Sequence, residues 1–314
     1  MQPELVATRY GLLQTPGAND LISRFLRDFG EWAWLEADFV GGFVQPGHRV
    51  LDGGAYMGSF TLGLAARRPA QVVAVEANPA VLGLLQHNLT TLAADWATLE
   101  PGLLGDGCTA VPEPRATHPN NLGATSFTGG PSLQPGATGE QTVPPLSLRG
   151  LRERHGPFDL IKLDVEGFEL ITLQGDADWL AEHRPTLWLE CNEDPAVLPL
   201  FEYVKALGYE LHYFAFPSFN PENHNGNLKP IFAISHEAGL LAVRPGTEVM
   251  MPPLQARTGC DLVRVQDREH LRRCLWLTPR WGEAEWADMP RSRLLALCAR
   301  LYGRQDLAQF LTCA

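Results

Sequence analysis

The 314-residue sequence is poor in basic residues. It has 25 lysines and arginines against 36 aspartates and glutamates, which gives a formal net charge of -11. Proteins that bind nucleic acid normally have a basic face, because binding releases counterions from the phosphate backbone. The charge balance therefore argues against a nucleic-acid partner and favours a substrate that is small or neutral.

Closely spaced cysteine pairs and long apolar runs are also lacking. The six cysteines are scattered, with no C-x-x-C pair and no His-rich segment at zinc spacing, which is typical of reduced thiols. No apolar run approaches the roughly 18 residues that a membrane span needs. The first residues, MQPELVATRYGLLQTPG, have neither the basic start nor the apolar stretch of a signal peptide. We therefore expect a cytoplasmic protein with no membrane span.

Short apolar runs alternate with helical patterns along most of the chain. Such alternation predicts an α/β fold with a mostly parallel sheet and helices on both of its faces. We expect seven strands, the last two as an antiparallel pair, at residues 48–54, 71–77, 97–104, 157–165, 185–191, 209–216 and 230–243.

By composition the chain divides into three segments. Residues 1–43 are expected to form a helical lead-in, with one amphipathic helix from Asp20 to Phe43. Residues 44–253 contain the alternating pattern, and within them the Gly-, Pro- and Thr-rich stretch 105–142 predicts a long loop. Residues 254–314 are rich in Arg and Trp and predict a helical appendage that covers the substrate pocket or forms a homodimer contact.

A glycine-rich turn, LDGGAYMGSF, follows the first predicted strand. Its glycines allow a sharp turn and a close approach of the backbone to a ligand. Asp52, directly before them, would repel a pyrophosphate but suits a cation such as the amino-acid end of S-adenosylmethionine. The spacing also departs from G-x-G-x-x-G, although tight packing alone would explain the glycines. The residues of this turn that we expect to bind the cofactor are Asp52, Gly53, Gly54, Ala55, Gly58 and Ser59.

Glu76 ends the second predicted strand, where its carboxylate is placed to accept hydrogen bonds from both ribose hydroxyls. Nicotinamide-dependent enzymes use the same interaction, so Glu76 does not discriminate between the two cofactors. Asn78 either assists Glu76 or caps the helix that begins at Pro79. Asp106 is placed to reach the adenine amino group, although an ordinary turn explains this residue equally well.

Carboxylates also follow the fourth and fifth predicted strands, in LIKLDVEGFEL and LWLECNE. Asp164 and Glu166 are expected close to the transferable methyl group, as a base, a metal ligand or a contact of the sulfonium. Helix capping is the alternative for Glu166. Asp164, Glu190 and Asn192 form a candidate oxygen-ligand set for Mg²⁺. Capping by Asn192 or Asp194 is the simpler interpretation, and it is favoured over a metal.

Together these segments resemble the FkbM-type methyltransferases. DGGAYMGSFTL is similar to the family's first motif, VVAVEANP with HNL to its second, and LIKLDVEGFEL with Gly175 to its most specific segment. RPTLWLECNE, LGYELHYF and FNPENHNGN follow in the family's order, so the resemblance covers about residues 20–243. Tyr56 departs from the pattern, because the family commonly has asparagine there. The tail after Pro253 lies outside the pattern.

The resemblance implies that residues 44–253 form a Rossmann-like class I methyltransferase domain. S-adenosylmethionine would be the methyl donor, and the acceptor would be a hydroxyl of a carbohydrate or another small molecule, such as a secondary metabolite. A base then has to remove the hydroxyl proton, and the candidates are Asp164, Glu166, Glu190, His212 and His224.

Two further sets of residues have alternative interpretations. Asn121 and Ser126 match a loop signature of the family, and they either order the loop over the cofactor or are ordinary polar loop residues. Aromatic residues of the sixth strand and the loop after it are expected either in an acceptor pocket or in the core: Tyr213, Phe214, Phe216 and Phe219.

Two other functions stay open on the sequence alone. A nicotinamide-dependent oxidoreductase would share the strand-helix-strand unit and Glu76, but Asp52, the glycine spacing and LDVEG oppose it. A non-catalytic cofactor-binding protein of the same fold is the second alternative, because a fold and a cofactor site do not establish turnover.

Overall fold

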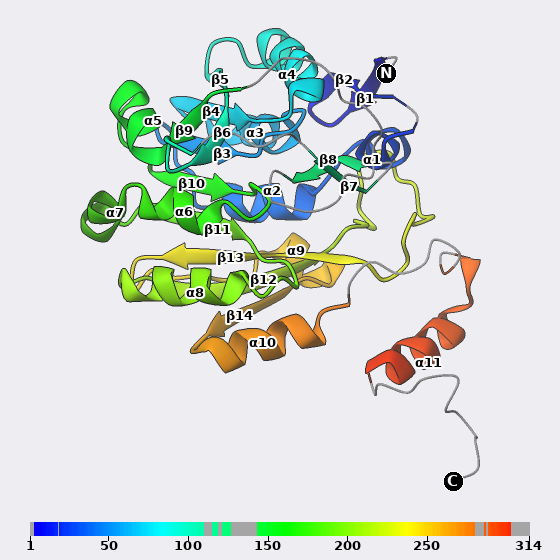
Figure 1. The fold of residues 1–314 in the computed structure, drawn as a ribbon. Helices are drawn as coiled ribbons and strands as arrows, with labels where there is room; N and C mark the ends of the chain where they lie inside the picture. The colour runs from blue at the N-terminus through cyan, green and yellow to red at the C-terminus, as the bar shows by residue number, and fades with distance from the viewer. Residues whose placement is uncertain are drawn as a thin grey trace.

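The computed structural model describes residues 3–17, 19–109, 115–118, 121–126, 143–279, 286 and 288–302. Its central sheet has eight strands: Arg49–Gly53 (β3), Gln71–Glu76 (β4), Ala97–Pro101 (β5), Leu160–Leu163 (β10), Thr186–Glu190 (β11), Glu210–Pro217 (β12), His236–Val243 (β13) and Asp261–Val265 (β14). Their order across the sheet is β14-β12-β13-β11-β10-β3-β4-β5 (Figure 1). The strands from β5 to β11 are parallel neighbours, whereas β13 is antiparallel to β11 and β12, and β14 is antiparallel to β12.

The expected α/β fold is confirmed, but the sheet has eight strands rather than the predicted seven. The additional strand is β14, which pairs with β12 and lies in the segment expected to be helical. Its five residues, DLVRV, are too few for periodicity to separate a strand from a helix. The same segment also contains the helices Pro253–Thr258 (α9), Arg268–Leu277 (α10) and Arg291–Tyr302 (α11).

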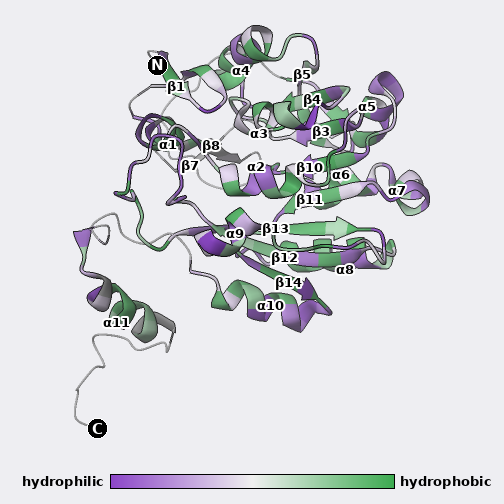
Figure 2. Ribbon diagram, turned by 180° about the vertical axis from the view of Figure 1, so that it is seen from behind, coloured by the Kyte–Doolittle hydropathy of each residue, from purple (hydrophilic) through white to green (hydrophobic). Residues whose placement is uncertain are grey.

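Helices cover both faces of the sheet, as predicted. One face packs against α9, Trp34–Gly41 (α2), Ser59–Gly63 (α3) and Pro79–Leu92 (α4). The other packs against α10, Leu148–His155 (α5), Glu169–Gln174 (α6), Ala177–His183 (α7) and Val197–Ala206 (α8). Side chains alternate along a strand, so β3 contributes Val50 to the first core and Leu51 to the second. Figure 2 shows apolar strands at the centre and more hydrophilic helices such as α7 outside them.

At the N-terminus, the single helix expected from the sequence is replaced by several elements. A hairpin of Glu4–Thr8 (β1) and Gly11–Thr15 (β2) precedes the helices Leu21–Phe29 (α1) and α2. The two helices are separated at Gly30 and Ala33, whose left-handed φ angles are 71° and 49°. Asp20 caps α1 and Gly30 ends it, as these residue types commonly do. Both helices bury apolar residues, so the amphipathic pattern of the sequence continues across this break and does not reveal it.

Short elements lie at the edge of the sheet where the parallel strands end. There Leu103–Gly105 (β6) pairs with Pro145–Ser147 (β9), whereas the 3-10 helix Ala65–Arg67 (η1) lies at the opposite end of the strands, between α3 and β4. Arg115–His118 (β7) forms a hairpin with Asn121–Ser126 (β8), which lies beside α1 at this edge (Figure 1). The predicted loop 105–142 thus contains a hairpin, and most of its other residues lie outside the described part of the chain. Among the helices that the structure describes, none is long and apolar enough to cross a membrane.

Gly239 of β13 lies against the indole of Trp188, which is only 1% exposed. A Cβ at this position would come within 2.2 Å of the Trp188 ring. We expect Gly239→Ala to lower the free energy of unfolding by about 1–3 kcal/mol in urea denaturation, because the packed ring has no room to move. The matched control is Gly83→Ala in α4, where a Cβ would meet nothing within 4 Å. That variant should gain up to about 1 kcal/mol from helix propensity. Equal stabilities for the two variants would contradict this packing.

Candidate functional site

The glycine turn brings the end of β3 against the end of β10. A Cβ on Gly54 would lie 1.8 Å from the main-chain oxygen of Asp164, so only glycine fits there. Gly54 and Gly58 have left-handed φ angles of 77° and 93°, which glycine adopts without strain. All the turn residues expected to bind the cofactor lie at this edge: Asp52, Gly53, Gly54, Ala55, Gly58 and Ser59.

Asp52 faces the interior of the protein. Its side chain is fully buried, one oxygen accepts a hydrogen bond from the Thr61 hydroxyl at 2.6 Å, and the other lies 3.4 Å from the Lys162 ammonium. Asp52 therefore has a cationic partner inside the protein, and its contact with a cofactor stays a prediction. The pairing of β3 with β10 places Lys162 opposite Asp52.

Lys162 also contacts a second carboxylate and lies near a third. Its ammonium is 3.3 Å from Asp164, and Glu36 of α2 contributes a further negative charge. Burial by itself would lower the pKa of Lys162, but Asp164, Asp52 and Glu36 together raise it, so the ammonium stays charged. Burial raises the pKa of Glu36 to about 7, against the opposing effects of Lys162 and of a 2.6 Å hydrogen bond from the Trp188 indole.

At the end of β4, main-chain N–H groups orient both carboxylate oxygens of Glu76. Oε2 accepts a hydrogen bond from Tyr56 at 2.8 Å, and Oε1 accepts one from Asn78 at 2.7 Å. Each carboxylate oxygen has a further lone pair, so Glu76 can still accept hydrogen bonds from a ligand. Asn78 caps α4 through the Ala80 N–H, as the capping interpretation held, and its amide donates to Thr125 of β8 at 3.0 Å.

Three carboxylates come together where β10 and β11 end. One oxygen from each of Asp164, Glu166 and Glu190 lies within 4.8 Å of the others. Oxygen atoms at such separations suit a divalent cation such as Mg²⁺. Asn192, a candidate Mg²⁺ ligand only in the less favoured interpretation, donates a hydrogen bond to Glu190. Asp194 accepts a hydrogen bond from the Ala196 N–H at 2.7 Å and so forms a turn directly before α8, whose N-cap, Ala196, has no side-chain cap.

Burial and the charges of neighbouring carboxylates favour the protonated forms of Glu166 and Glu190. Burial, then the charges of Asp164 and Glu169, raise the pKa of Glu166 to about 8. Burial and the neighbouring carboxylates also raise the pKa of Glu190 well above its usual range. Glu169, rather than Glu166, accepts the N–H groups of residues 165 and 167 and so fixes this turn. Carboxyl groups with raised pKa values are suited to proton transfer near neutral pH.

Asp106 and His212 have structural roles of their own. Asp106 accepts hydrogen bonds from the Thr109 hydroxyl and from the N–H groups of Thr109 and Cys108, which lower its pKa to about 2. The ordinary turn is therefore the better interpretation of Asp106. His212 is buried beside Glu210 on β12, and two strands separate β12 from β10.

The aromatic residues of β12 belong to the core rather than to a pocket. Tyr213, Phe214 and Phe216 are each at most 3% exposed, and Phe214 stacks on Phe39 with ring centroids 3.9 Å apart. Phe219 packs edge-on against Phe29 of α1. Asn121 and Ser126 lie in β8, but their side chains are outside the described part of the structure.

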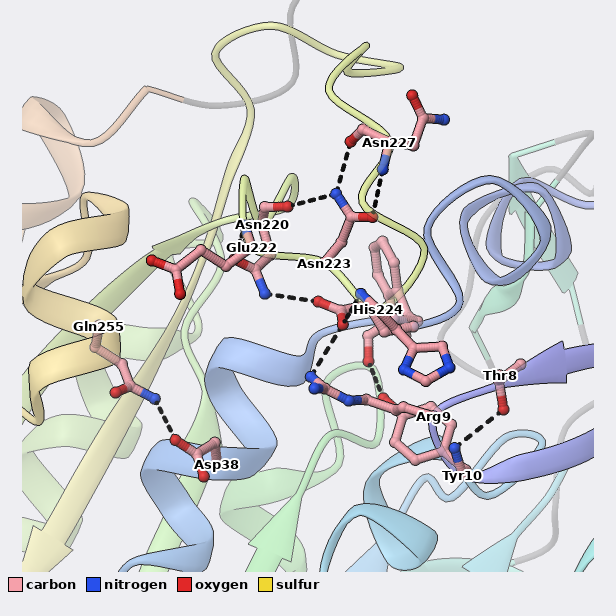
Figure 3. Close-up of polar contacts among 12 residues, drawn as sticks. Thr8, Arg9, Tyr10, Asp38, Asn220, Glu222, Asn223, His224, Asn227 and Gln255 are labelled. Carbon is pink, nitrogen blue, oxygen red and sulfur yellow. Dashed lines mark hydrogen bonds and ion pairs between the residues drawn. The ribbon is translucent and has the colours of Figure 1, made fainter.

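Figure 3 shows how the loop that contains His224 is anchored on the N-terminal segment. The buried carboxylate of Glu31 accepts hydrogen bonds from the Asn220 amide at 2.8 Å and from the His224 main-chain N–H at 3.0 Å. Arg9 pairs with Glu31 at 2.9 Å, and Asn223 closes the loop by donating to Asn227. This loop follows the carboxyl end of β12, and the residue His224 is exposed.

The buried acids Glu36, near Lys162, and Glu31, which anchors the loop of His224, were not predicted from the sequence. Glu36 and Glu31 are acids in an amphipathic pattern, where a solvent-exposed position is the ordinary expectation. Lys162 offered the one signal, because a lysine inside an apolar strand requires buried partners.

The residues of this site also lie within the segment that matches a known protein family. The family model described as the methyltransferase FkbM domain matches residues 52–211, which include the glycine turn, Glu76 and the three clustered carboxylates. The chain belongs to the FkbM methyltransferase family. Its α/β sheet is accordingly a Rossmann-like methyltransferase sheet.

Several solved structures are similar to this FkbM-family chain. An FkbM methyltransferase from Methylobacillus flagellatus is 17% identical over 62% of this chain and 43% of its own, with a TM-score of 0.42, so this chain spans less than half of that protein. A precorrin-6y C5,15-methyltransferase from Geobacter metallireducens is 13% identical over 66% and 87%, with a TM-score of 0.39. A putative tRNA methyltransferase from Streptococcus pneumoniae, in complex with S-adenosyl-L-methionine, is 12% identical over 70% and 76%, with a TM-score of 0.39. The comparison with curated proteins found no match.

Because the pKa of Glu36 is raised, we expect the stability of this FkbM-family protein to depend on pH. This pKa rises from 4.5 to about 7 on folding, so the folded state binds the extra proton and the free energy of unfolding falls as the pH rises between these values. We expect Glu36→Gln to reduce the loss of stability between pH 5 and pH 8 by about 2 kcal/mol, measured by urea denaturation at each pH.

The control for this experiment is Glu182→Gln, because the Glu182 side chain is 79% exposed. Its stability profile should follow that of the wild type. A Glu36→Gln profile parallel to the wild type would show that Glu36 ionises normally in the folded protein.

Proposed function

We propose that this FkbM-family chain is an S-adenosylmethionine-dependent O-methyltransferase whose acceptor is a hydroxyl of a sugar or a secondary metabolite. The observation that carries the proposal is the contact of the glycine turn with Asp164, where no Cβ fits between the two backbones. This contact puts the turn directly beside the carboxylates at the ends of β10 and β11. Donor and acceptor would then meet at one edge of the sheet, where open α/β sheets bind their ligands.

The side chains at this edge fit the chemistry of the donor. When bound, S-adenosylmethionine supplies an electrophilic methyl group on a sulfonium cation. Both Asp164 and Asp52 contact Lys162, but we assign Asp164 to that cation because its side chain is 40% exposed, whereas Asp52 is fully buried. Glu76 is assigned to the ribose hydroxyls, since two main-chain N–H groups hold its carboxylate in place.

For the acceptor, the required step is removal of the hydroxyl proton as the oxygen attacks the methyl group. We favour Glu166 as the base, because its pKa of about 8 makes its carboxylate more basic than an ordinary glutamate. Glu190 lies close enough to Glu166 to share the proton. His224 is the second candidate base. Holding the hydroxyl in line with the methyl group would supply much of the rate acceleration.

Ligand binding tests the proposal directly. In equilibrium titrations we expect the protein to bind S-adenosylmethionine and S-adenosylhomocysteine but not NAD. Radiolabelled S-adenosylmethionine, incubated with sugar, glycolipid and polyketide hydroxyls, should then yield a labelled product. Absence of S-adenosylmethionine binding would overturn the proposal, and binding without any labelled product would favour a non-catalytic protein. Loss of turnover with a chelator would assign a divalent cation to the Asp164, Glu166 and Glu190 carboxylates.

A pH profile of kcat tests the base. Because Glu166 must be deprotonated to accept the proton, kcat should rise with pH through about 8, the pKa of this group. We expect Glu166→Gln to lower kcat by about a hundredfold and to remove this rise. His224→Gln should leave the shape of the profile unchanged. The reverse pattern, with the rise lost only in His224→Gln, would assign the base to His224.

A further inference from the structure

Tyr56 occupies an unusual backbone conformation within the glycine turn. Its φ angle is 51°, in a region that bulky side chains rarely adopt. Such strain persists only where the surroundings hold it. In this case two hydrogen bonds do so: the Tyr56 N–H donates to Glu76 at 2.8 Å, and its hydroxyl donates to Asp20 at 3.0 Å. Asparagine, the residue that the resemblance leads us to expect here, has a side chain too short to replace the second bond.

Asp20 connects Tyr56 to two other elements. The residue is 5% exposed, and its Oδ2 accepts hydrogen bonds from the N–H and the hydroxyl of Ser23 in the first turn of α1. Its Oδ1, the atom that accepts the Tyr56 hydroxyl, also accepts the main-chain N–H of Leu122 in β8 at 3.2 Å. One buried carboxylate thus joins α1, the glycine turn and β8.

Leu122 is also held through its main-chain oxygen, by Asn78 at the N-cap of α4. The Asn78 amide donates to the Leu122 main-chain oxygen at 3.3 Å and to the Thr125 hydroxyl at 3.0 Å. Asn78 in turn donates its N–H to Glu76, which also accepts the N–H of Tyr56. The hydrogen bonds therefore close a ring through Asp20, Tyr56, Glu76, Asn78 and Leu122, which we call the β8 ring.

We propose that the β8 ring holds β8 over the ribose end of the cofactor site, and that Tyr56 and Asp20 are positioning residues for cofactor binding. The inference rests on the proposed function, because Glu76 is the carboxylate assigned to the ribose. The hydroxyl-carboxylate bond between Tyr56 and Asp20 links β8 to the turn, and a buried bond to a charged group is among the stronger hydrogen bonds in proteins. Burial and the charge of Asp20 raise the pKa of Tyr56, so its hydroxyl remains a donor throughout the neutral range.

The test compares Tyr56→Phe with Tyr10→Phe. Each substitution removes one phenolic hydroxyl and its hydrogen bond. The bond lost in Tyr56→Phe is the one to Asp20, and the bond lost in Tyr10→Phe is the one to the main-chain oxygen of Trp32. For Tyr56→Phe we expect faster amide hydrogen exchange at residues 121–126 and about tenfold weaker binding of S-adenosylhomocysteine in titration calorimetry. Tyr10→Phe should leave both measurements at wild-type values.

A second variant protects the test against misfolding. Asp20→Asn can keep the cap of α1, because asparagine is as good a cap as aspartate, while its amide nitrogen replaces the acceptor used by Tyr56 and Leu122. It should reproduce both effects of Tyr56→Phe. Unchanged exchange at 121–126 in both variants would overturn the β8 ring, and faster exchange with unchanged affinity would overturn its role in cofactor binding. Failure of the wild type to bind S-adenosylhomocysteine would instead overturn the proposed function. The exchange rates at residues 121–126 would still show whether the β8 ring holds β8.

Discussion

The ammonium group of Lys162 is the charge on which the carboxyl edge of the sheet depends. It lies within 3.4 Å of carboxylates from two neighbouring strands, Asp52 and Asp164, and Glu36 of α2 adds a third negative charge nearby. An uncompensated buried charge costs about 3–5 kcal/mol, so Asp52 requires this partner in order to remain buried. Asp164, the residue directly after β10, follows Lys162 by two positions, and its N–H continues the strand pairing to Gly53, so the two side chains lie on the same side of the sheet. The glycine turn and the carboxylate cluster are thereby held in one arrangement.

This edge holds more carboxyl groups than Lys162 can balance. Glu166 and Glu190 have raised pKa values because burial and neighbouring carboxylates both disfavour ionisation. Such an arrangement lowers the stability of the fold, and groups of this kind are concentrated at functional sites. In the proposed reaction the arrangement would have two chemical uses: it would attract a cationic methyl donor, and it would retain a base with a raised pKa.

Two further buried carboxylates fix the segments around the edge. Asp20 accepts the main-chain N–H of Leu122, and Glu31 accepts that of His224. Both acids lie at the ends of α1, so this helix positions β8 on one side and the 220–227 loop on the other. In the 220–227 loop a side chain strengthens this anchor, because the Asn220 amide also donates to Glu31.

The sequence by itself determined the α/β class, most of the strands, the glycine turn and the carboxylates at the strand ends. These features are local: short apolar runs are typical of buried strands, and glycines directly after a strand allow a sharp turn. The close contact of Gly54 with the backbone of Asp164 is tertiary. Only the tertiary structure decided the partners of the charged groups. Strand pairing placed Lys162 against Asp52, and packing of α2 brought Glu36 near the same ammonium. The edge strand β14 and the contacts of Asp20 and Glu31 also depend on segments distant in sequence, whose approach is set by burial and hydrogen bonding rather than by local pattern.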